Sequence, residues 1–104
     1  MSLPSLTDSQ RAAALRKATA VRMERREFKL RVEAGDLSLL AALDYARDHD
    51  AIAGIRVVDL LKCLPGTGPR RAEEAMVEIG IAMSRRLRGL GENQRQSLVE
   101  RFEP

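Results

Sequence analysis

Apolar residues recur at helical spacing along nearly the whole chain, and no segment alternates apolar and polar residues as a half-buried strand would. Two short segments repeat the i, i+3, i+4, i+7 spacing that places four side chains on one helix face: Val57, Leu60, Leu61 and Leu64 in the first, and Ala72, Ala75, Met76 and Ile79 in the second. The sequence therefore predicts an all-α protein.

The N-terminal segment carries signals for both ends of a helix. Thr7 followed by Gln10 has the spacing of a capping box, in which each side chain bonds the other residue's backbone amide. Gly35 is placed to end the helix, because glycine tolerates the left-handed conformation that commonly follows a last turn. These signals predict one helix from Asp8 to about Ala34.

The two halves of this helix differ in apolar content. Phe28 and Val32 are spaced to face a core, whereas the preceding RAAALRKATAVRMERR has few apolar anchors besides alanine. A helix with so narrow an apolar stripe gains little by packing. We therefore expect residues 1–35 to form a helical arm, projecting from Met1 to about Arg22, and residues 36–104 to form a compact domain.

Three residues mark the ends of helices expected in the compact domain. Ser38 can cap the start of a helix, Gly54 marks a turn, and Gly80 ends a helix. The cap begins a helix that ends near Asp48 or Asp50, and a last helix fits Glu92 to Phe102.

Charge is abundant and unevenly distributed. Charged residues make up 32% of the chain, the formal net charge is +3, and the sequence pI is about 9.6. Between Asp8 and Glu33, eight Arg or Lys residues face four acids, while residues 36–50 are acidic. Such asymmetry points to a polyanionic partner. Aromatic residues are only 3% of the chain, too few for a base-stacking platform, so a duplex is favoured over a single strand.

Few residues offer catalytic or metal chemistry. Cys63 is the one cysteine, which excludes a disulfide framework and predicts a small core residue. His49, the one histidine, lies between Asp48 and Asp50, where we expect it to be exposed at a helix end and not a metal ligand. We expect no enzymatic activity, cofactor, metal or small-molecule substrate. No apolar signal segment or membrane span is found, which predicts a cytoplasmic protein without a membrane partner.

The stretch LPGTGPRRA joins the two short helices. A dinucleotide fingerprint would need a preceding strand and a third glycine where Arg71 stands, and the Gly-Lys-Ser/Thr of a phosphate-binding loop is absent. Gly66 and Gly68 can adopt positive φ, and Pro69 suits the first position of the next helix. The stretch therefore predicts a helix–hairpin–helix turn.

This turn is a candidate phosphate site. The Thr67 and Gly68 amides, with those at the start of the next helix, would converge on one point, and Arg70 and Arg71 add positive charge beside it. The same residues are also compatible with a glycine turn that only joins two packed helices.

The stretch SRRLRGLGENQ, residues 84–94, is a second candidate site. Three arginines cluster just before two glycines: Arg85, Arg86 and Arg88, then Gly89 and Gly91. Two basic turns separated by one short helix are expected to fall on the same face of so small a domain. An ordinary solvated charge run is the alternative interpretation.

The order LPG-x-G-xx-A, then IG-I, then S-RR-x-RGLG-x-NQ resembles the actinobacterial integration host factor family, over essentially the whole chain. The turn arrangement is also similar to the helix-two-turn-helix modules of a small-subunit ribosomal protein and of some DNA glycosylases. The resemblance implies a long N-terminal helix followed by a helix-two-turn-helix domain. It implies a nucleoid-associated protein, expected to be a monomer, that binds double-stranded DNA with little sequence preference and bends or shapes it. It implies no relation to the heterodimeric β-arm integration host factor of enteric bacteria.

The resemblance also implies site residues. The hairpin glycines and Thr67 would clamp phosphates, and the arginines of the second stretch would reach into or along a groove. Pro69 departs from the family, which commonly has Lys or Arg there, and Arg70 and Arg71 would offset the lost charge. A second DNA-facing surface would be supplied by basic residues of the first helix, namely Arg22, Arg25, Lys29 and Arg31. The expected DNA-binding set is Gly66, Thr67, Gly68, Arg70, Arg71, Arg85, Arg86, Arg88, Gly89, Asn93 and Lys29.

Two other function classes stay open on the sequence alone. A structured-RNA or ribosome-associated protein would use the same basic turns on RNA helices. A protein-interaction module would dock a partner helix on the region from Leu39 to Leu43.

Overall fold

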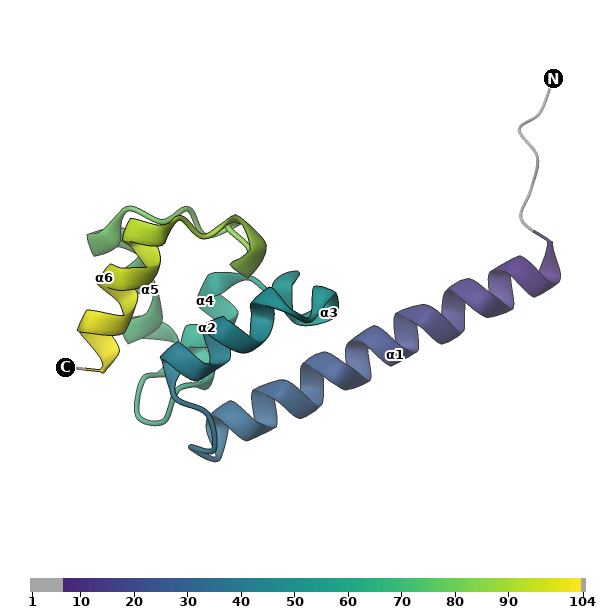
Figure 1. Ribbon diagram of the computed structural model, residues 1–104, viewed down its shortest axis with the longest axis horizontal. Coiled ribbons are helices and arrows are strands. Elements are labelled where there is room, and N and C mark those ends of the chain that lie inside the picture. Colours follow the sequence, from purple (N-terminus) through teal and green to yellow (C-terminus); the bar gives the residue numbers. More distant parts are fainter. Residues whose placement is uncertain (1–6, 104) are drawn as a thin grey trace, which may run out of the picture.

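A computed structural model describes residues 7–103 of the chain. Within that range the protein is all-helical, as the apolar spacing predicts, and contains no β-strand. One long helix, α1, projects from a cluster of shorter helices (Figure 1). The part of the expected arm before Thr7 lies outside the described residues.

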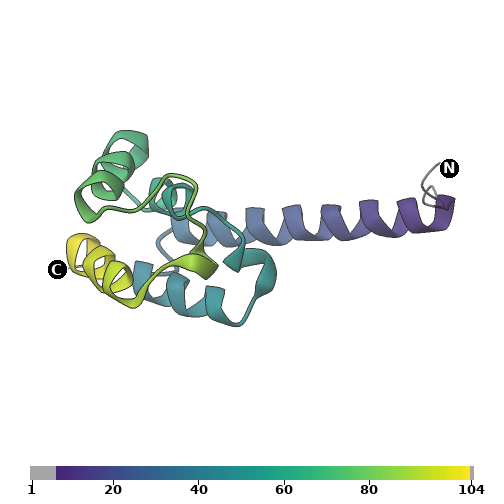
Figure 2. The same cartoon turned by 90° about the horizontal axis from the view of Figure 1, so that it is seen from above.

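Helix α1 spans Asp8–Glu33, and its two ends form as the sequence predicts. The Gln10 amide donates to Thr7 Oγ1 over 3.1 Å, and the Thr7 amide donates to Gln10 Oε1 over 2.8 Å. Gly35 follows the last turn with a φ of 80°. Phe28 and Val32 are the buried residues of α1, so its N-terminal half extends away from the other helices (Figure 2).

The other elements follow in chain order. They are α2 (Leu39–Arg47), α3 (Asp50–Ala53), α4 (Val57–Cys63), α5 (Gly68–Ile79), the 3-10 turn η1 (Leu87–Gly89) and α6 (Glu92–Phe102). Ser38 caps α2, because its hydroxyl accepts from the Ala41 amide over 3.1 Å. Gly80 ends α5 with a φ of 81°. The bounds of α6 are those expected, whereas α3 and η1 were not predicted.

The core lies between α4 and the helices around it. The α4 face predicted from spacing is buried in full, and Leu98 is the buried residue of α6, a helix that packs against α5 and α2. Cys63, expected in this core, is only half-buried at its edge, where its thiol donates to the Asp59 carbonyl over 3.3 Å. Burial, followed by the nearby charge of Glu33, raises the pKa of the Cys63 thiol.

A stack of rings joins α1 to α2. The Phe28 and Tyr45 ring centroids are 5.5 Å apart, and those of Tyr45 and His49 are 3.7 Å apart. His49 Nδ1 lies 2.8 Å from the Tyr45 carbonyl oxygen. The expectation that His49 is exposed is therefore wrong: the ring is half-buried because an aromatic neighbour one turn earlier covers it.

The chain end closes the domain. The Glu103 carboxylate accepts from the backbone amides of Leu39 and Leu40, so it caps the start of α2 from the far end of the sequence. A negative charge at the N-terminus of a helix is stabilising, because this end of the helix dipole carries partial positive charge. Among the described residues, no helix is both long and apolar enough to cross a bilayer.

Candidate nucleic-acid interface

The hairpin turn, residues 64–67, reverses the chain between α4 and α5. Gly66 and Gly68 have φ values of 77° and 68°, the left-handed region expected of them. The Thr67 amide donates to the Leu64 carbonyl over 3.1 Å, which closes the turn. The prediction that the Thr67 amide points at a phosphate is therefore wrong, because this N–H is already bonded.

The Gly68 and Arg70 amides are among those that remain available at this turn. Helix α5 begins at Gly68, so Pro69 occupies its second position and not its first. The first turn of a helix leaves its N–H groups without intrahelical acceptors. Among the described residues, no hydrogen bond donated by the Gly68 or Arg70 amide is found. The anion site of the hairpin turn thus consists of two backbone donors at the positive end of a twelve-residue helix.

The arginines beside the hairpin turn differ in their contacts. Arg70 Nε lies 3.2 Å from Glu74 Oε1, and the Arg70 side chain is 92% exposed. Arg71 Nη1 approaches the Gly66 carbonyl at 3.4 Å and so lies over the turn. A hollow of about 410 Å³ beside the turn is lined by Arg71 and Arg101. Arg71 is thus the better placed of the two predicted arginines.

The arginine loop, residues 84–89, is fixed by contacts with the start of α4. The Val57 amide donates to the Arg85 carbonyl, and the Leu87 amide donates to the Ile55 carbonyl, each over 2.9 Å. The two segments form an isolated antiparallel bridge between Arg56 and Arg86. The loop is therefore held by residues about thirty positions earlier in the chain, and it is not a free charge run.

Three arginines from distant segments converge on Gly54 at the end of α3. Arg86 Nη1 donates to the Gly54 carbonyl, and Arg25 Nε of α1 donates to the Ala51 carbonyl over 2.7 Å. A Cβ added at Gly54 would lie against Arg25 Nη2 and 3.0 Å from Arg88 Nη2. We call Arg25, Arg86 and Arg88 the Gly54 cluster.

The Gly54 cluster is a concentration of unbalanced positive charge. Among the described residues, none of its three members forms an ion pair with a carboxylate, whereas four other arginines do: Arg47, Arg70, Arg95 and Arg101. Backbone carbonyls at the end of α3 attract the guanidinium groups. Mutual repulsion of three cations is then relieved best by an external anion.

The remaining predicted residues are distributed more widely. Arg85 Nη1 donates to the Gly89 carbonyl over 2.8 Å, so Arg85 braces η1 and does not join the Gly54 cluster. A Cβ at Gly89 would lie 3.3 Å from Arg85 Cδ, so the Arg85 side chain would have to shift by a few tenths of an ångström to accommodate it. Asn93 is exposed on the first turn of α6. Lys29 is half-buried and shares a shallow hollow along α1 with Arg22 and Arg25.

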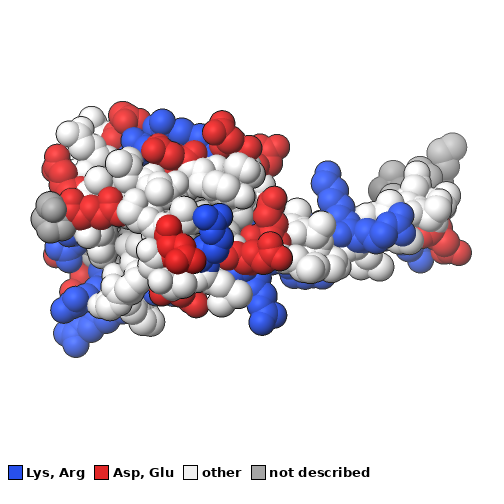
Figure 3. Space-filling model, turned by 60° about the horizontal axis from the view of Figure 1, so that its bottom comes forward, with Lys and Arg blue, Asp and Glu red and all other residues white. Residues whose placement is uncertain are grey.

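The two turns do not form one continuous site. The arginine loop is bonded to the start of α4 and the hairpin turn follows its end, so the seven residues of α4 separate them by about 10 Å. Figure 1 shows them at opposite ends of the short-helix cluster. On the face seen in Figure 3, basic and acidic side chains are interspersed, and further basic groups follow the projecting helix.

Sequence reasoning placed Arg25 only within a general basic surface on the first helix. Its position in the Gly54 cluster depends on how α1 packs against α3, which no local pattern encodes. Only the structure shows that Gly54, interpreted from the sequence as a turn, is a buried glycine without a positive φ, which marks a close approach of other groups.

Comparisons with known proteins identify relatives along the whole chain. Residues 32–102 match the family described as S13-like H2TH domain. The chain is 47% identical to proteins named integration host factor from Mycobacterium tuberculosis, over 98% of this chain and 97% of that protein, and from Streptomyces coelicolor, over 98% and 95%. A solved structure described as sIHF bound to an 8bp palindromic DNA superposes with a TM-score of 0.80 at 42% identity, covering 84% of this chain and 98% of the other.

Proposed function

The chain belongs to the actinobacterial integration host factor family, and from this membership and the Gly54 cluster we propose that it is a nucleoid-associated protein that binds duplex DNA. It does so with low sequence specificity, through guanidinium groups and backbone amides, and it bends or otherwise shapes the duplex. A related protein, 42% identical to this chain, has been solved with DNA.

The observation that carries the proposal is the Gly54 cluster. Its three guanidinium groups come from α1 and the arginine loop and have no carboxylate partner among the described residues. Arginine presents a planar fork of donors that matches phosphate oxygens and guanine edges. Clustered, partly fixed arginines therefore favour a polyanion over a single small anion.

The hairpin turn provides a second contact with the same duplex. It lies about 10 Å from the arginine loop along α4, a distance between the widths of the minor and major grooves, about 6 and 12 Å. The Gly68 and Arg70 amides would hold a phosphate at one groove edge while the Gly54 cluster contacts the groove or its opposite edge. Phosphate contacts carry no base information, which accounts for low specificity.

Fluorescence anisotropy with a labelled duplex tests the proposal. We expect the logarithm of the association constant to fall with the logarithm of salt concentration, by roughly 0.9 per neutralised phosphate, with about four to eight contacts. Combined alanine substitution of Arg25, Arg86 and Arg88 should reduce that slope and weaken binding. Affinity that is independent of salt, or unchanged in the triple variant, contradicts the proposal.

A competition experiment between DNA and RNA decides which of the two nucleic acids the protein binds preferentially. The match to the S13-like H2TH domain keeps a structured RNA as the alternative partner. An unlabelled RNA hairpin and an unlabelled DNA duplex of equal length should compete unequally, with the DNA displacing the probe at lower concentration. Preference for the RNA hairpin would replace DNA with RNA in the proposal.

Bending needs a separate measurement. A duplex carrying donor and acceptor dyes at its ends should show increased energy transfer when the protein binds. The same duplex with the triple alanine variant is the control. If the protein saturates the duplex and energy transfer does not change, the protein binds DNA but does not bend it.

A further inference from the structure

A cleft that shares only Arg88 with the proposed DNA contacts lies beside α2. Its volume is about 330 Å³, and α3, η1 and the start of α6 complete its walls. That volume lies at the lower end of the range of small-molecule sites, roughly 300–1,000 Å³. Apolar side chains form much of its lining, among them Leu43, Leu87 and Leu90.

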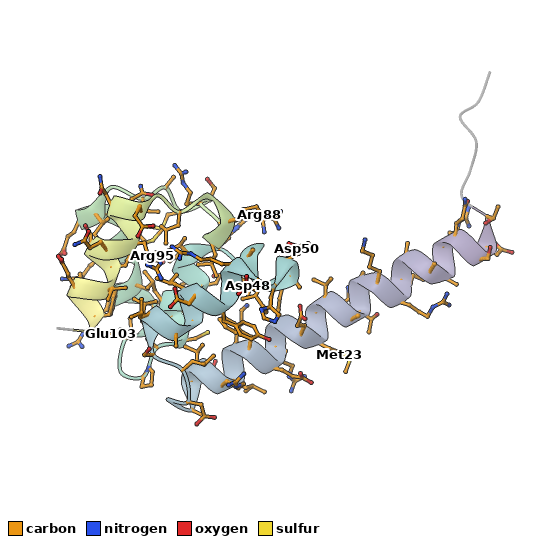
Figure 4. The ribbon with its side chains drawn as sticks, in the orientation of Figure 1. Met23, Asp48, Asp50, Arg88, Arg95 and Glu103 are labelled. Atoms are coloured by element: carbon orange, nitrogen blue, oxygen red, sulfur yellow. The ribbon has the colours of Figure 1, made fainter. Side chains whose placement is uncertain are left out.

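The polar lining of the cleft consists mainly of guanidinium groups. Arg47, Arg88 and Arg95 contribute to it, with Asp50 as the one carboxylate. Figure 4 shows that Asp50, Arg88 and Arg95 come from three different elements grouped around α2. A lining that combines leucines with hydrogen-bond donors suits a ligand with an apolar body and an anionic head.

Two of these arginines are held in place before any ligand arrives. Arg95 bonds to Asp44 and also lies 3.6 Å from Glu92, while Arg47 lies 3.3 Å from the same Glu92. The Arg95 side chain is only 17% exposed. A ligand entering the cleft would therefore meet guanidinium groups whose positions are already fixed, which lowers the entropic cost of binding.

We propose that this cleft binds a small organic anion, a carboxylate or phosphate attached to an apolar body. The anionic head contacts Arg47, Arg88 and Arg95, and the apolar body contacts the leucines of the lining. Because Arg88 also belongs to the Gly54 cluster, ligand and DNA compete for one guanidinium. This regulatory consequence rests on the proposed DNA-binding function, whereas ligand binding itself does not.

Phenyl phosphate is a suitable probe, with inorganic phosphate and phenol as its two halves. In a two-dimensional NMR titration of the full chain without DNA, phenyl phosphate should give saturable shifts at the amides of Leu43, Ala53 and Leu90. Inorganic phosphate should bind at least tenfold more weakly. Equal affinity for inorganic phosphate, or shifts distributed over all exposed arginines, would overturn the site.

Two variants separate the cleft from general anion attraction. Ala53→Leu fills the cleft and should abolish saturable binding, and Ala14→Leu makes the same change on the exposed part of α1 and should leave binding intact. Arg47→Gln removes one half-exposed guanidinium and should weaken binding at least threefold. Wild-type affinity in Ala53→Leu overturns the site.

Anisotropy with duplex DNA tests the coupling. At constant ionic strength, saturating phenyl phosphate should weaken DNA binding at least threefold, and by reciprocity DNA should weaken ligand binding equally. If DNA affinity is unchanged when phenyl phosphate saturates the cleft, the coupling through Arg88 is overturned. If the protein binds no DNA at all, the proposed function fails while the NMR titration still decides the cleft.

Discussion

The hairpin turn and the arginine loop both belong to the predicted DNA-binding set but are held in different ways. The hairpin turn is local: Gly66 and Gly68, both at positive φ, and the hydrogen bond from the Thr67 amide to the Leu64 carbonyl form it. The arginine loop depends on distant partners, since Arg86 bonds Gly54 and the Arg85 carbonyl accepts from Val57. Changes in the loop should therefore affect both folding and binding, whereas selected changes in the turn should affect binding alone.

Arg86→Ala should have the largest effect. It removes a charged hydrogen bond to a buried carbonyl, which costs about 1.5–3 kcal/mol in free energy of unfolding. It also removes a member of the Gly54 cluster, which should weaken duplex binding by about 1–3 kcal/mol if the group is desolvated in a groove. Urea unfolding measures the first quantity and anisotropy the second.

Arg88→Ala is the matched control for Arg86→Ala. Arg88 forms no hydrogen bond or ion pair with another described residue, so its loss should weaken DNA binding without lowering the free energy of unfolding. Equal destabilisation by both variants would show that the loop is not anchored through Arg86. Wild-type DNA affinity in Arg88→Ala would remove Arg88 from the interface.

Gly68→Val should have the next largest effect. A β-branched residue at a φ of 68° is strained by about 1–3 kcal/mol. A Cβ there meets no atom within 4 Å, so the side chain projects into the open space where a phosphate would approach the amides. Affinity should fall for every duplex sequence alike, because phosphate contacts carry no base information.

Gly80→Val makes the Gly68 comparison specific. Gly80 has a φ of 81° and equally open surroundings, but it lies at the opposite end of α5, away from the free amides. Both variants should lose similar free energy of unfolding, and only Gly68→Val should lose DNA affinity. If folded Gly68→Val binds as tightly as Gly80→Val, the hairpin turn is only a connector between two helices.

The same contrast between local and distant contacts explains what could be predicted from the sequence. Caps at Thr7 and Ser38 and stops at Gly35 and Gly80 act within a few residues, so the long helices were predicted nearly to the residue. The short elements α3 and η1 were missed because each has too few residues to show a period. Tertiary contacts form them.

The candidate site divides in the same way. The positive φ values of Gly66 and Gly68 follow from residue type and spacing. The hydrogen bond of the Thr67 amide could not be predicted from residue type, because it depends on where the Leu64 carbonyl points after α4 ends. The separation of Arg85 from Arg86 and Arg88 was likewise hidden, since three arginines in one loop look alike until Gly54 and α1 are placed around them.

Thr67→Ala should have the smallest effect and tests whether the hairpin turn acts through its backbone alone. The substitution retains the amide that bonds Leu64, and the Thr67 hydroxyl makes no capping bond to α5. We expect changes within about 0.5 kcal/mol in both the free energy of unfolding and DNA affinity, as at ordinary surface positions. A tenfold loss of affinity in folded Thr67→Ala, restored in Thr67→Ser, would show instead that the hydroxyl contacts the phosphate. The hairpin turn would then contribute a side chain as well as its two amides.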